Sequence, residues 1–178
     1  MHTLSSVCKA LKKQRRKKIV LHGGSFDLIH IGHIRLLAKA KAAGDILVVG
    51  LNSDDLIRRI KSPRRPIIPE KQRAEVLLGL KSVDYVFISD RKVHNDKHLT
   101  KLKPDILVFS KEKKKLARHK KAALDIAKKF PAIKTIFLSA GTADKISTST
   151  IEAGIVEKFM AEVEGARQKE IRTRKKTR

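Results

Sequence analysis

Five short apolar segments, separated by stretches with helical character, constrain the fold of this chain more than any other feature. The apolar segments are residues 18–23, 45–52, 83–89, 105–110 and 134–140, and helical stretches cover about 30–43, 70–80, 95–102 and 120–130. Strands that are apolar along nearly their whole length are typical of parallel sheets buried on both faces. The sequence therefore predicts an α/β fold: a doubly wound, Rossmann-like parallel sheet of about five strands with helices on both faces.

The first strand-to-helix turn carries the strongest local signal for a ligand. Gly23, Gly24 and Ser25 follow the first predicted strand directly. In doubly wound sheets, ligands bind at the carboxyl ends of the strands, and free N–H groups at a helix start attract anions. The turn has neither the G-x-G-x-x-G spacing of dinucleotide sites nor the G-K-[ST] of a P-loop. It predicts a phosphate site of another kind, although small residues also occur in such turns for purely structural reasons.

Two histidines open the helix that follows this turn. His30 and His33 are three residues apart and therefore share a face of the helix, with Gly32 leaving room for a ligand between them. Two imidazoles in this place can donate hydrogen bonds to phosphate oxygens; the alternative is that one caps or packs and the other is exposed. No third ligand lies at a plausible spacing, so we expect no metal site. Asp27 is expected to cap the helix.

The charge of the chain is strongly positive, with 42 Lys and Arg against 18 Asp and Glu and a formal net charge of +24. Such a charge attracts polyanions. Basic runs at both ends predict solvated tails at 1–17 and 166–178, flanking one domain at 18–165. Weak contact of these tails with polyanions is an expected interaction, and a nucleic-acid-binding protein on the same scaffold is the alternative of another class. Few aromatic residues argue against base-stacking platforms.

Nothing in the sequence indicates a membrane or a signal peptide. It contains neither a long apolar run nor an apolar segment behind the N-terminal basic residues. Cys8 is the only cysteine, which excludes an internal disulfide bond. These features predict a cytoplasmic protein without a membrane span. We expect His94, His98 and His119, which lie in polar or lysine-rich surroundings, to be surface residues.

Two motifs together resemble a known family. The segment HIGH at 30–33, after GGSFDL, is similar to the HxGH signature of the nucleotidylyltransferase superfamily of cytidylyltransferase-like proteins, and KISTST at 145–150 resembles its ISTT or ISTS element. Members transfer a nucleoside monophosphate from a nucleoside triphosphate and release pyrophosphate. The resemblance implies that the nucleotide is bound by Gly23, Gly24, Ser25, Phe26, Ser147, Thr148 and Ser149.

Residues in the middle of the chain resemble one group of enzymes within this superfamily. Residues 51–88 look like the corresponding stretch of heptose 1-phosphate adenylyltransferases, in which Lys61, Arg65 and Arg73 match basic positions. The resemblance implies that His30, His33, Lys61 and Arg73 are the catalytic residues. Residues 110–115, SKEKKK, depart from the KGGDY-like segment of the heptose enzymes and leave the sugar open. The ISTS element also occurs in glycerol, choline and ethanolamine phosphate cytidylyltransferases, so CTP with an alcohol phosphate is the alternative.

The resulting functional prediction is transfer of NMP from an NTP, with ATP favoured, to a phosphorylated small molecule such as a sugar 1-phosphate. Mg²⁺ is the expected cofactor, held by phosphate oxygens and water rather than by protein ligands. Family members commonly form dimers, so a homodimer is among the expected partners. Such a reaction brings several negative charges into one cleft, so basic residues are expected there on physical grounds alone, to neutralise them.

Overall fold

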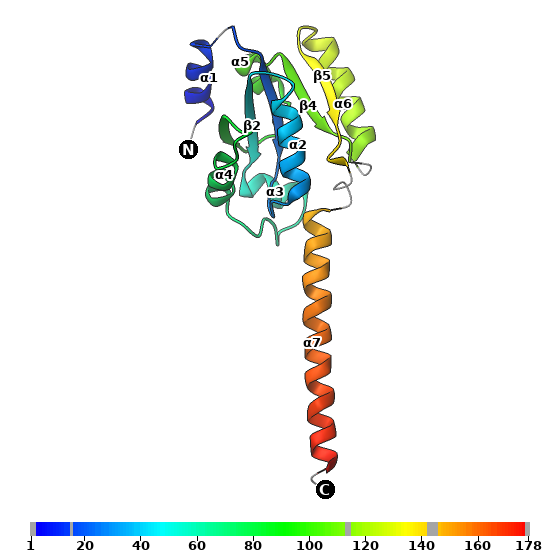
Figure 1. The fold of residues 1–178 in the computed structure, drawn as a ribbon. Helices are drawn as coiled ribbons and strands as arrows, with labels where there is room; N and C mark the ends of the chain where they lie inside the picture. The colour runs from blue at the N-terminus through cyan, green and yellow to red at the C-terminus, as the bar shows by residue number, and fades with distance from the viewer. Residues whose placement is uncertain (1–2, 15, 113–114, 142–145, 177–178) are drawn as a thin grey trace.

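A five-stranded, entirely parallel sheet forms the centre of the protein, as seen in a computed structural model that describes residues 3–14, 16–112, 115–141 and 146–176 (Figure 1). The strands are β1 (Ile19–Gly24), β2 (Ile46–Asn52), β3 (Tyr85–Ser89), β4 (Ile106–Ser110) and β5 (Lys134–Leu138). Their order in the sheet is β3-β2-β1-β4-β5. The predicted fold class and the five predicted strands are confirmed.

Helices cover both faces of the sheet because successive strand side chains point to opposite sides. On one face, Val20 of β1 packs in the same cluster as Leu37 of α2 (Ile31–Lys41) and Leu77 of α4 (Glu70–Leu78). On the other face, Leu21 shares a cluster with residues of α1 (Leu4–Lys12), α5 (Asp96–Leu102) and α6 (Leu116–Lys129). A short helix, α3 (Asp54–Ile60), follows β2.

The N-terminal segment is not the solvated tail that its basic residues predicted. Residues 4–12 form helix α1, which begins at a Thr3 side-chain cap and buries Val7 and Leu11 in the core. Basic residues of this helix remain on its exposed side, because the two apolar positions four residues apart define the buried face. The globular part of the chain therefore begins before residue 18.

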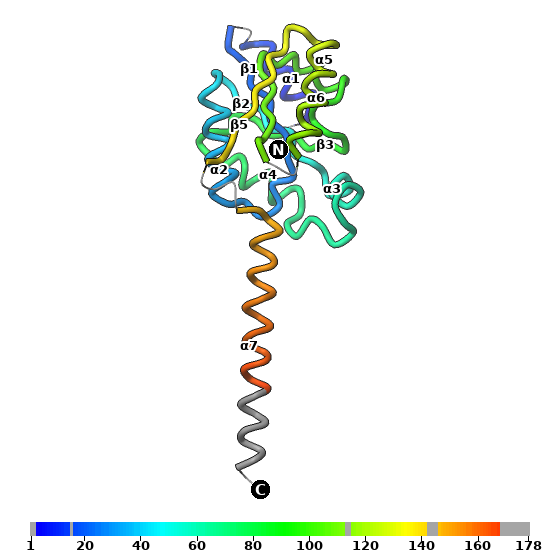
Figure 2. The backbone as a smooth tube through the Cα atoms, turned by 90° about the vertical axis from the view of Figure 1, so that its right-hand side faces the viewer, coloured from blue at the N-terminus to red at the C-terminus, as the bar shows by residue number. Residues whose placement is uncertain are grey.

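A long helix, α7 (Thr148–Lys176), begins beneath the sheet and projects away from the domain (Figures 1 and 2). The expected basic tail from residue 166 is the continuation of this helix up to Lys176 rather than a separate segment. In the described part of the chain, none of the helices is long and apolar enough to cross a membrane.

The order of the strands places a topological switch point beside β1. The chain runs from β1 to β2 and β3 on one side of the sheet and then crosses to β4 on the other side of β1. Leu21 pairs with Val48 of β2 and with Leu107 of β4, so β1 lies between the two halves. Ligands of such sheets bind beyond the carboxyl ends of the strands at this point. The ends of β1 and β4 are therefore the place to look for a site.

Candidate functional site

Neighbouring side chains pack closely around the two glycines where β1 ends and the turn begins. A Cβ on Gly24 would lie 2.8 Å from the ring of Phe26, and one on Gly23 would overlap Cγ1 of Val93. Phe26 has a positive φ of 46° and is 3% exposed. Its ring packs against His33, with centroids 5.2 Å apart. The side chain of Phe26 is thus buried against the histidine, and a nucleotide contact by this residue stays a prediction.

His30 and His33 lie together at the start of α2. His30 is the N-cap, and its Nδ1 accepts a hydrogen bond of 3.2 Å from the N–H of Gly32. The proton of the neutral ring is then on Nε2, which can donate to a ligand. The two ring centroids are 3.9 Å apart. Burial lowers the pKa of His30, and burial together with the charge of His30 lowers the pKa of His33 to about 3.

Both imidazoles are therefore neutral near pH 7, and one nitrogen of the pair stands out. Among the described residues, Nδ1 of His33 is a buried polar atom without a hydrogen-bond partner. Buried polar atoms in folded proteins are rarely left unpaired, and each exception calls for an explanation. A ligand at the start of α2 is one such explanation, since the positive end of the helix dipole faces the same place.

Asp27 does not cap α2 as the sequence predicted, because His30 takes that position. Its buried carboxylate instead accepts hydrogen bonds from the N–H groups of Ile67 and Ile68, at 2.9 and 3.0 Å, and from Arg65 at 2.9 Å. Arg65 also forms an ion pair with Glu152 in the first turns of α7. The chain Asp27–Arg65–Glu152 joins the β1–α2 turn, the 61–69 loop and α7.

This ion-pair chain brings the second predicted motif to the carboxyl ends of the strands. Ser147 and Thr150 cap α7 reciprocally: Oγ of Ser147 accepts from the N–H of Thr150 at 3.2 Å, and the Ser147 N–H donates to Oγ1 of Thr150 at 2.8 Å. Thr148 is half-buried and Ser149 is exposed in the same turn. Figure 1 shows α7 beginning at the end of the sheet where α2 also begins. Lys145 of the predicted motif lies outside the described residues.

Positive charges crowd this end of the molecule. Lys61 is partly open to solvent, but desolvation by its surroundings lowers its pKa, and the charges of Lys115 and Arg65 lower it further. The carboxylates of Asp27 and Glu112 act in the opposite direction without overcoming this effect. Lys115, 2.5 Å from Glu112, also lowers the pKa of His33. Neighbouring positive charges that lower the pKa of Lys61 favour a ligand with several negative charges here.

Arg73, a predicted catalytic residue, is buried and bonded to backbone groups of the protein. It is 1% exposed, and its guanidinium donates to the carbonyl oxygens of Ile68, Ser25 and Asn52 and to the carboxylate of Asp54. Four of its five N–H donors are therefore used within the protein. These bonds hold the β1–α2 turn against the end of β2, and the catalytic role of Arg73 stays a prediction.

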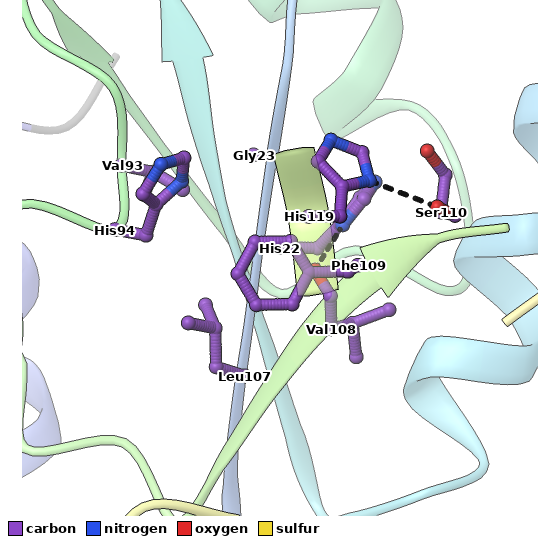
Figure 3. A pocket seen from close by; sticks show the side chains of 9 residues that line it. All are labelled: His22, Gly23, Val93, His94, Leu107, Val108, Phe109, Ser110 and His119. Atoms are coloured by element: carbon purple, nitrogen blue, oxygen red, sulfur yellow. Dashed lines mark hydrogen bonds between the residues drawn. The ribbon is translucent and has the colours of Figure 1, made fainter. Parts of the chain in front are cut away.

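A small cavity of about 70 Å³ lies over the ends of β1 and β4, where the 93–94 loop and α6 also line it (Figure 3). Three of its lining residues are histidines: His22, His94 and His119. Nδ1 of His22 is 3.0 Å from the carbonyl oxygen of Val108, and Nδ1 of His119 is 2.9 Å from that of Ser110. A carbonyl partner fixes the proton on Nδ1 and leaves Nε2 as an acceptor. Burial lowers the pKa of both residues, and that of His94 to about 4.

The expectation that His94, His98 and His119 are surface residues is wrong for His98 and incomplete for the others. His98 is 5% exposed, with its ring nitrogens close to Ser89 and Asn95. His94 and His119 are half-buried, and both pack against the Phe109 ring, at centroid distances of 5.5 and 5.2 Å. Polar neighbours in sequence say little about burial, because His98 and His119 lie on faces of α5 and α6 that turn toward the sheet and His94 lies in the loop before α5.

Sequence reasoning overlooked two residues of this region. Lys115 belongs to a lysine-rich run, in which side chains are usually solvated. Its position soon after the end of β4 indicates that it can lie near a site at the carboxyl ends of the strands. His22 was also missed, although an imidazole near the end of a strand that is otherwise apolar is unusual. Among the described residues, no group of three or more His, Cys, Asp or Glu could hold a metal ion.

The sequence of the chain is similar to one family model and to several known proteins. A family model described as cytidylyltransferase-like matches residues 21–154. The protein called "Bifunctional protein HldE" is 46% identical over 98 residues in Syntrophotalea carbinolica, covering 55% of this chain and 20% of that protein. A Helicobacter pylori protein of the same name is 50% identical over 100 residues, covering 56% of this chain and 22% of that protein. The chain thus spans about a fifth of the length of these relatives.

Two solved structures have similar folds. The lipopolysaccharide core biosynthesis protein from Thermoplasma volcanium matches with a TM-score of 0.58 and 29% identity, over 69% of this chain and 97% of that one. Pantothenate synthetase from Thermus thermophilus matches with a TM-score of 0.57 over 86% of this chain and 69% of that one. Its sequence identity is 13%, so this second likeness concerns the fold alone.

Proposed function

This chain belongs to the cytidylyltransferase-like family, and on that premise we propose that it is a nucleotidylyltransferase. It would transfer the nucleoside monophosphate of an NTP, with ATP favoured, to a phosphorylated small molecule such as a sugar 1-phosphate. An oxygen of the acceptor phosphate attacks the α-phosphorus, the bond from that phosphorus to the bridging oxygen breaks, and pyrophosphate leaves. The products are an NDP-linked compound and pyrophosphate.

The ion-pair chain Asp27–Arg65–Glu152 is the observation that carries this proposal. It ties the start of α7 to the turn before α2, although the two segments are more than a hundred residues apart in sequence. An NTP lying between them would meet N–H groups and imidazoles on one side and the hydroxyl groups of Ser147, Thr148 and Ser149 on the other. A site assembled from two helix starts suits a triphosphate, which carries its charges in a row.

The roles of the residues follow from their environments. His30 and His33 are neutral and would donate N–H hydrogen bonds to the phosphate oxygens, with a gain in strength as charge develops in the transition state. Lys61 and Lys115 would neutralise the triphosphate and the leaving pyrophosphate. Gly24 and Ser25 would allow the backbone to approach the phosphates closely. Arg73 would act indirectly, by fixing the carbonyl group of Ser25.

The cavity lined by His22, His94 and His119 supports an acceptor with hydroxyl groups. Two of these rings hold their protons on Nδ1 toward backbone carbonyls, so their Nε2 atoms are acceptors and suit O–H donors. A sugar phosphate offers such donors beside its phosphate. The cavity of about 70 Å³ would take only part of the acceptor, with the remainder lying nearer the turn after β1.

Mg²⁺ belongs to this proposal as an ion held mainly by phosphate oxygens and water, which would help to neutralise the triphosphate. The donors gathered around the turn are imidazoles and cationic groups, which do not form a protein-held Mg²⁺ site. No step of the proposed reaction is therefore assigned to protein ligands of the ion. The experiment below includes Mg²⁺ and a control without it.

Pyrophosphate release by the purified chain tests the proposal. The chain is incubated with Mg²⁺, each of ATP, CTP, GTP and UTP, and a panel of sugar 1-phosphates and alcohol phosphates. We expect release with ATP and a sugar 1-phosphate, and a loss of about 100-fold in His33→Ala, because removing one preorganised donor costs roughly 3 kcal/mol. Lys61→Met should be impaired in the same way, whereas Lys71→Met, on the exposed side of α4, is the matched control.

The outcomes separate the alternatives. Release with CTP and glycerol, choline or ethanolamine phosphate would replace the favoured substrates by the alternative pair. Release that is equal in His33→Ala and the unmodified chain would contradict the assignment of the site. Salt-dependent RNA binding without nucleotide affinity would favour the nucleic-acid-binding alternative.

A further inference from the structure

Helices α1, α5 and α6 form one layer on the same face of the sheet. All three pack in the cluster that contains Leu21. The thiol of Cys8 on α1 donates to the carbonyl oxygen of Lys101 on α5 at 3.6 Å, and Lys129 on α6 forms an ion pair of 2.9 Å with Asp96 on α5. Figure 2 shows the three helices on one side of the sheet and α2 on the opposite side. The layer therefore crosses a sheet that, with its five strands about 4.8 Å apart, is about 19 Å wide.

The outer side of this layer is strongly basic. Its three helices contain nine Lys and Arg residues against two Asp, whereas α2, α3 and α4 contain seven basic and four acidic residues. All nine basic side chains are exposed. Within the described part of the chain, Lys129 is the only one of the nine in an ion pair. We call the exposed basic side of α1, α5 and α6 the basic face; its members include Lys9, Lys12, Lys97, Lys101, Lys121 and Lys128.

The other side chains of the basic face indicate which polyanion fits it. On the described residues of these helices, Leu124 is the one large apolar side chain that is exposed. Helices that bind a membrane surface insert several apolar side chains, so the face does not suit a lipid bilayer. The three helices contain no Phe, Tyr or Trp, so they offer no aromatic platform for the bases of a single strand. A double helix needs neither, because it presents a regular array of phosphates on its outside.

A groove of about 380 Å³ lies between α1 and β3 and extends the basic face toward the edge of the sheet. Nε2 of Gln14 donates to the hydroxyl group of Tyr85 at 3.0 Å and so fixes one wall of the groove. Lys9 and Lys13, four residues apart, place two ammonium groups on the same side of α1. Ammonium, amide and hydroxyl groups are the side chains that bind the sugar-phosphate backbone. The lining residues are Ser6, Lys9, Ala10, Lys13, Gln14 and Tyr85.

We propose that the basic face binds the sugar-phosphate backbone of a nucleic-acid duplex without regard to base sequence. A duplex carries one negative charge per about 1.7 Å of its axis, so a face about 19 Å wide meets roughly eleven phosphate charges. This is enough to engage lysines of all three helices at once. The binding is an activity beyond the proposed nucleotidyl transfer, because the catalytic region lies at the carboxyl ends of the strands and the basic face lies along one side of the sheet. It also differs from contact through solvated tails, since α1 is a packed helix.

Fluorescence anisotropy of the full chain with labelled duplexes of about 20 base pairs, between about 50 and 200 mM salt, tests this proposal. We expect RNA and DNA duplexes of unrelated sequences to bind alike, because lysines that contact phosphates do not read bases. In Lys97→Gln/Lys101→Gln/Lys121→Gln the affinity should fall about tenfold or more, and the slope of log affinity against log salt should flatten by about 3, close to 0.9 per lost contact.

The matched control is Lys71→Gln/Lys81→Gln/Lys158→Gln, which removes the same charge from exposed lysines outside the basic face and should bind nearly as the unmodified chain does. All six lysines are exposed, so both variants should fold, as circular dichroism can check. Pyrophosphate release should be equal in both variants and in the unmodified chain, so a chain without transferase activity leaves the duplex test intact.

Four results would overturn the proposal: no duplex binding at about 50 mM salt, equal loss of affinity in the two triple variants, unchanged affinity in Lys97→Gln/Lys101→Gln/Lys121→Gln, or tighter binding to single strands than to duplexes. Vesicles containing anionic lipid are the remaining probe. Binding to these vesicles that depends on Lys97, Lys101 and Lys121, in a chain that does not bind duplexes, would replace the nucleic acid by a membrane surface.

Discussion

Acid should destabilise this protein through His33, and replacing His33 should remove a defined part of that effect. The pKa of His33 in the folded chain is about 3, against 6.5 for an ordinary histidine. Below pH 6.5 His33 therefore binds a proton in the unfolded chain, whereas in the folded chain it binds one only below about pH 3. Stability is fully present above pH 6.5 and falls as the pH is lowered, by up to about 1.4 kcal/mol per pH unit. Between pH 8 and 4.5 the loss due to His33 is about 3 kcal/mol.

Urea unfolding at a series of pH values measures this loss. His33→Gln should be nearly as stable as, or less stable than, the unmodified chain at pH 8, and should lose about 3 kcal/mol less between pH 8 and 4.5. His94, whose pKa is lowered to about 4, should behave similarly in His94→Gln and serves as an independent comparison. Parallel curves for His33→Gln and the unmodified chain would refute the reasoning, since they would mean that His33 titrates alike in both states.

Three further predictions concern the residues that hold the site. Arg73→Lys should lower the free energy of unfolding by about 3–5 kcal/mol, because it leaves buried partners unpaired, and a loss under 1 kcal/mol in urea would contradict this. Gly23→Ala should cost about 1–3 kcal/mol by crowding Val93, with part of the loss recovered on adding Val93→Ala; calorimetry showing additive losses would argue against the contact. Glu152→Gln should raise the KM for NTP more than it lowers kcat, whereas Glu162→Gln, farther along α7, should change neither; equal kinetics in both would separate α7 from nucleotide binding.

The sequence was informative about the fold because the relevant pattern is local. Each of the five strands was recognisable from a short apolar run, and the glycine-rich turn could be placed at the end of the first strand. The segment 4–12 was misjudged because its basic residues and their neighbours obscure the two apolar positions, Val7 and Leu11, that decide its burial. Overall charge describes what faces water, and a few well-spaced apolar side chains suffice to bury a helix.

The site was harder to predict because its contacts join distant segments. Asp27 is next to α2 in sequence but uses its carboxylate on the 61–69 loop, and Arg73 uses its charge on backbone carbonyls. Neither choice follows from residue type, since a carboxylate before a helix and an arginine near a phosphate site each have a more familiar role. Only the structure shows that Asp27 holds the 61–69 loop and that Arg73 holds the β1–α2 turn against β2.

This support has an electrostatic consequence for the site. Asp27 and Glu152 both pair with Arg65, so neither carboxylate fully neutralises the charge of Lys61. His30 and His33 are neutral and therefore add no further positive charge to this region. A bound polyanion would reverse this balance: it would stabilise the ammonium groups and raise the pKa values of the histidines. Ligand binding and protonation of His33 would then favour one another, because by linkage a ligand that raises a pKa binds more tightly as the proton is bound. The burial that makes His33 destabilising in acid therefore also keeps its ring neutral until a bound polyanion raises its pKa.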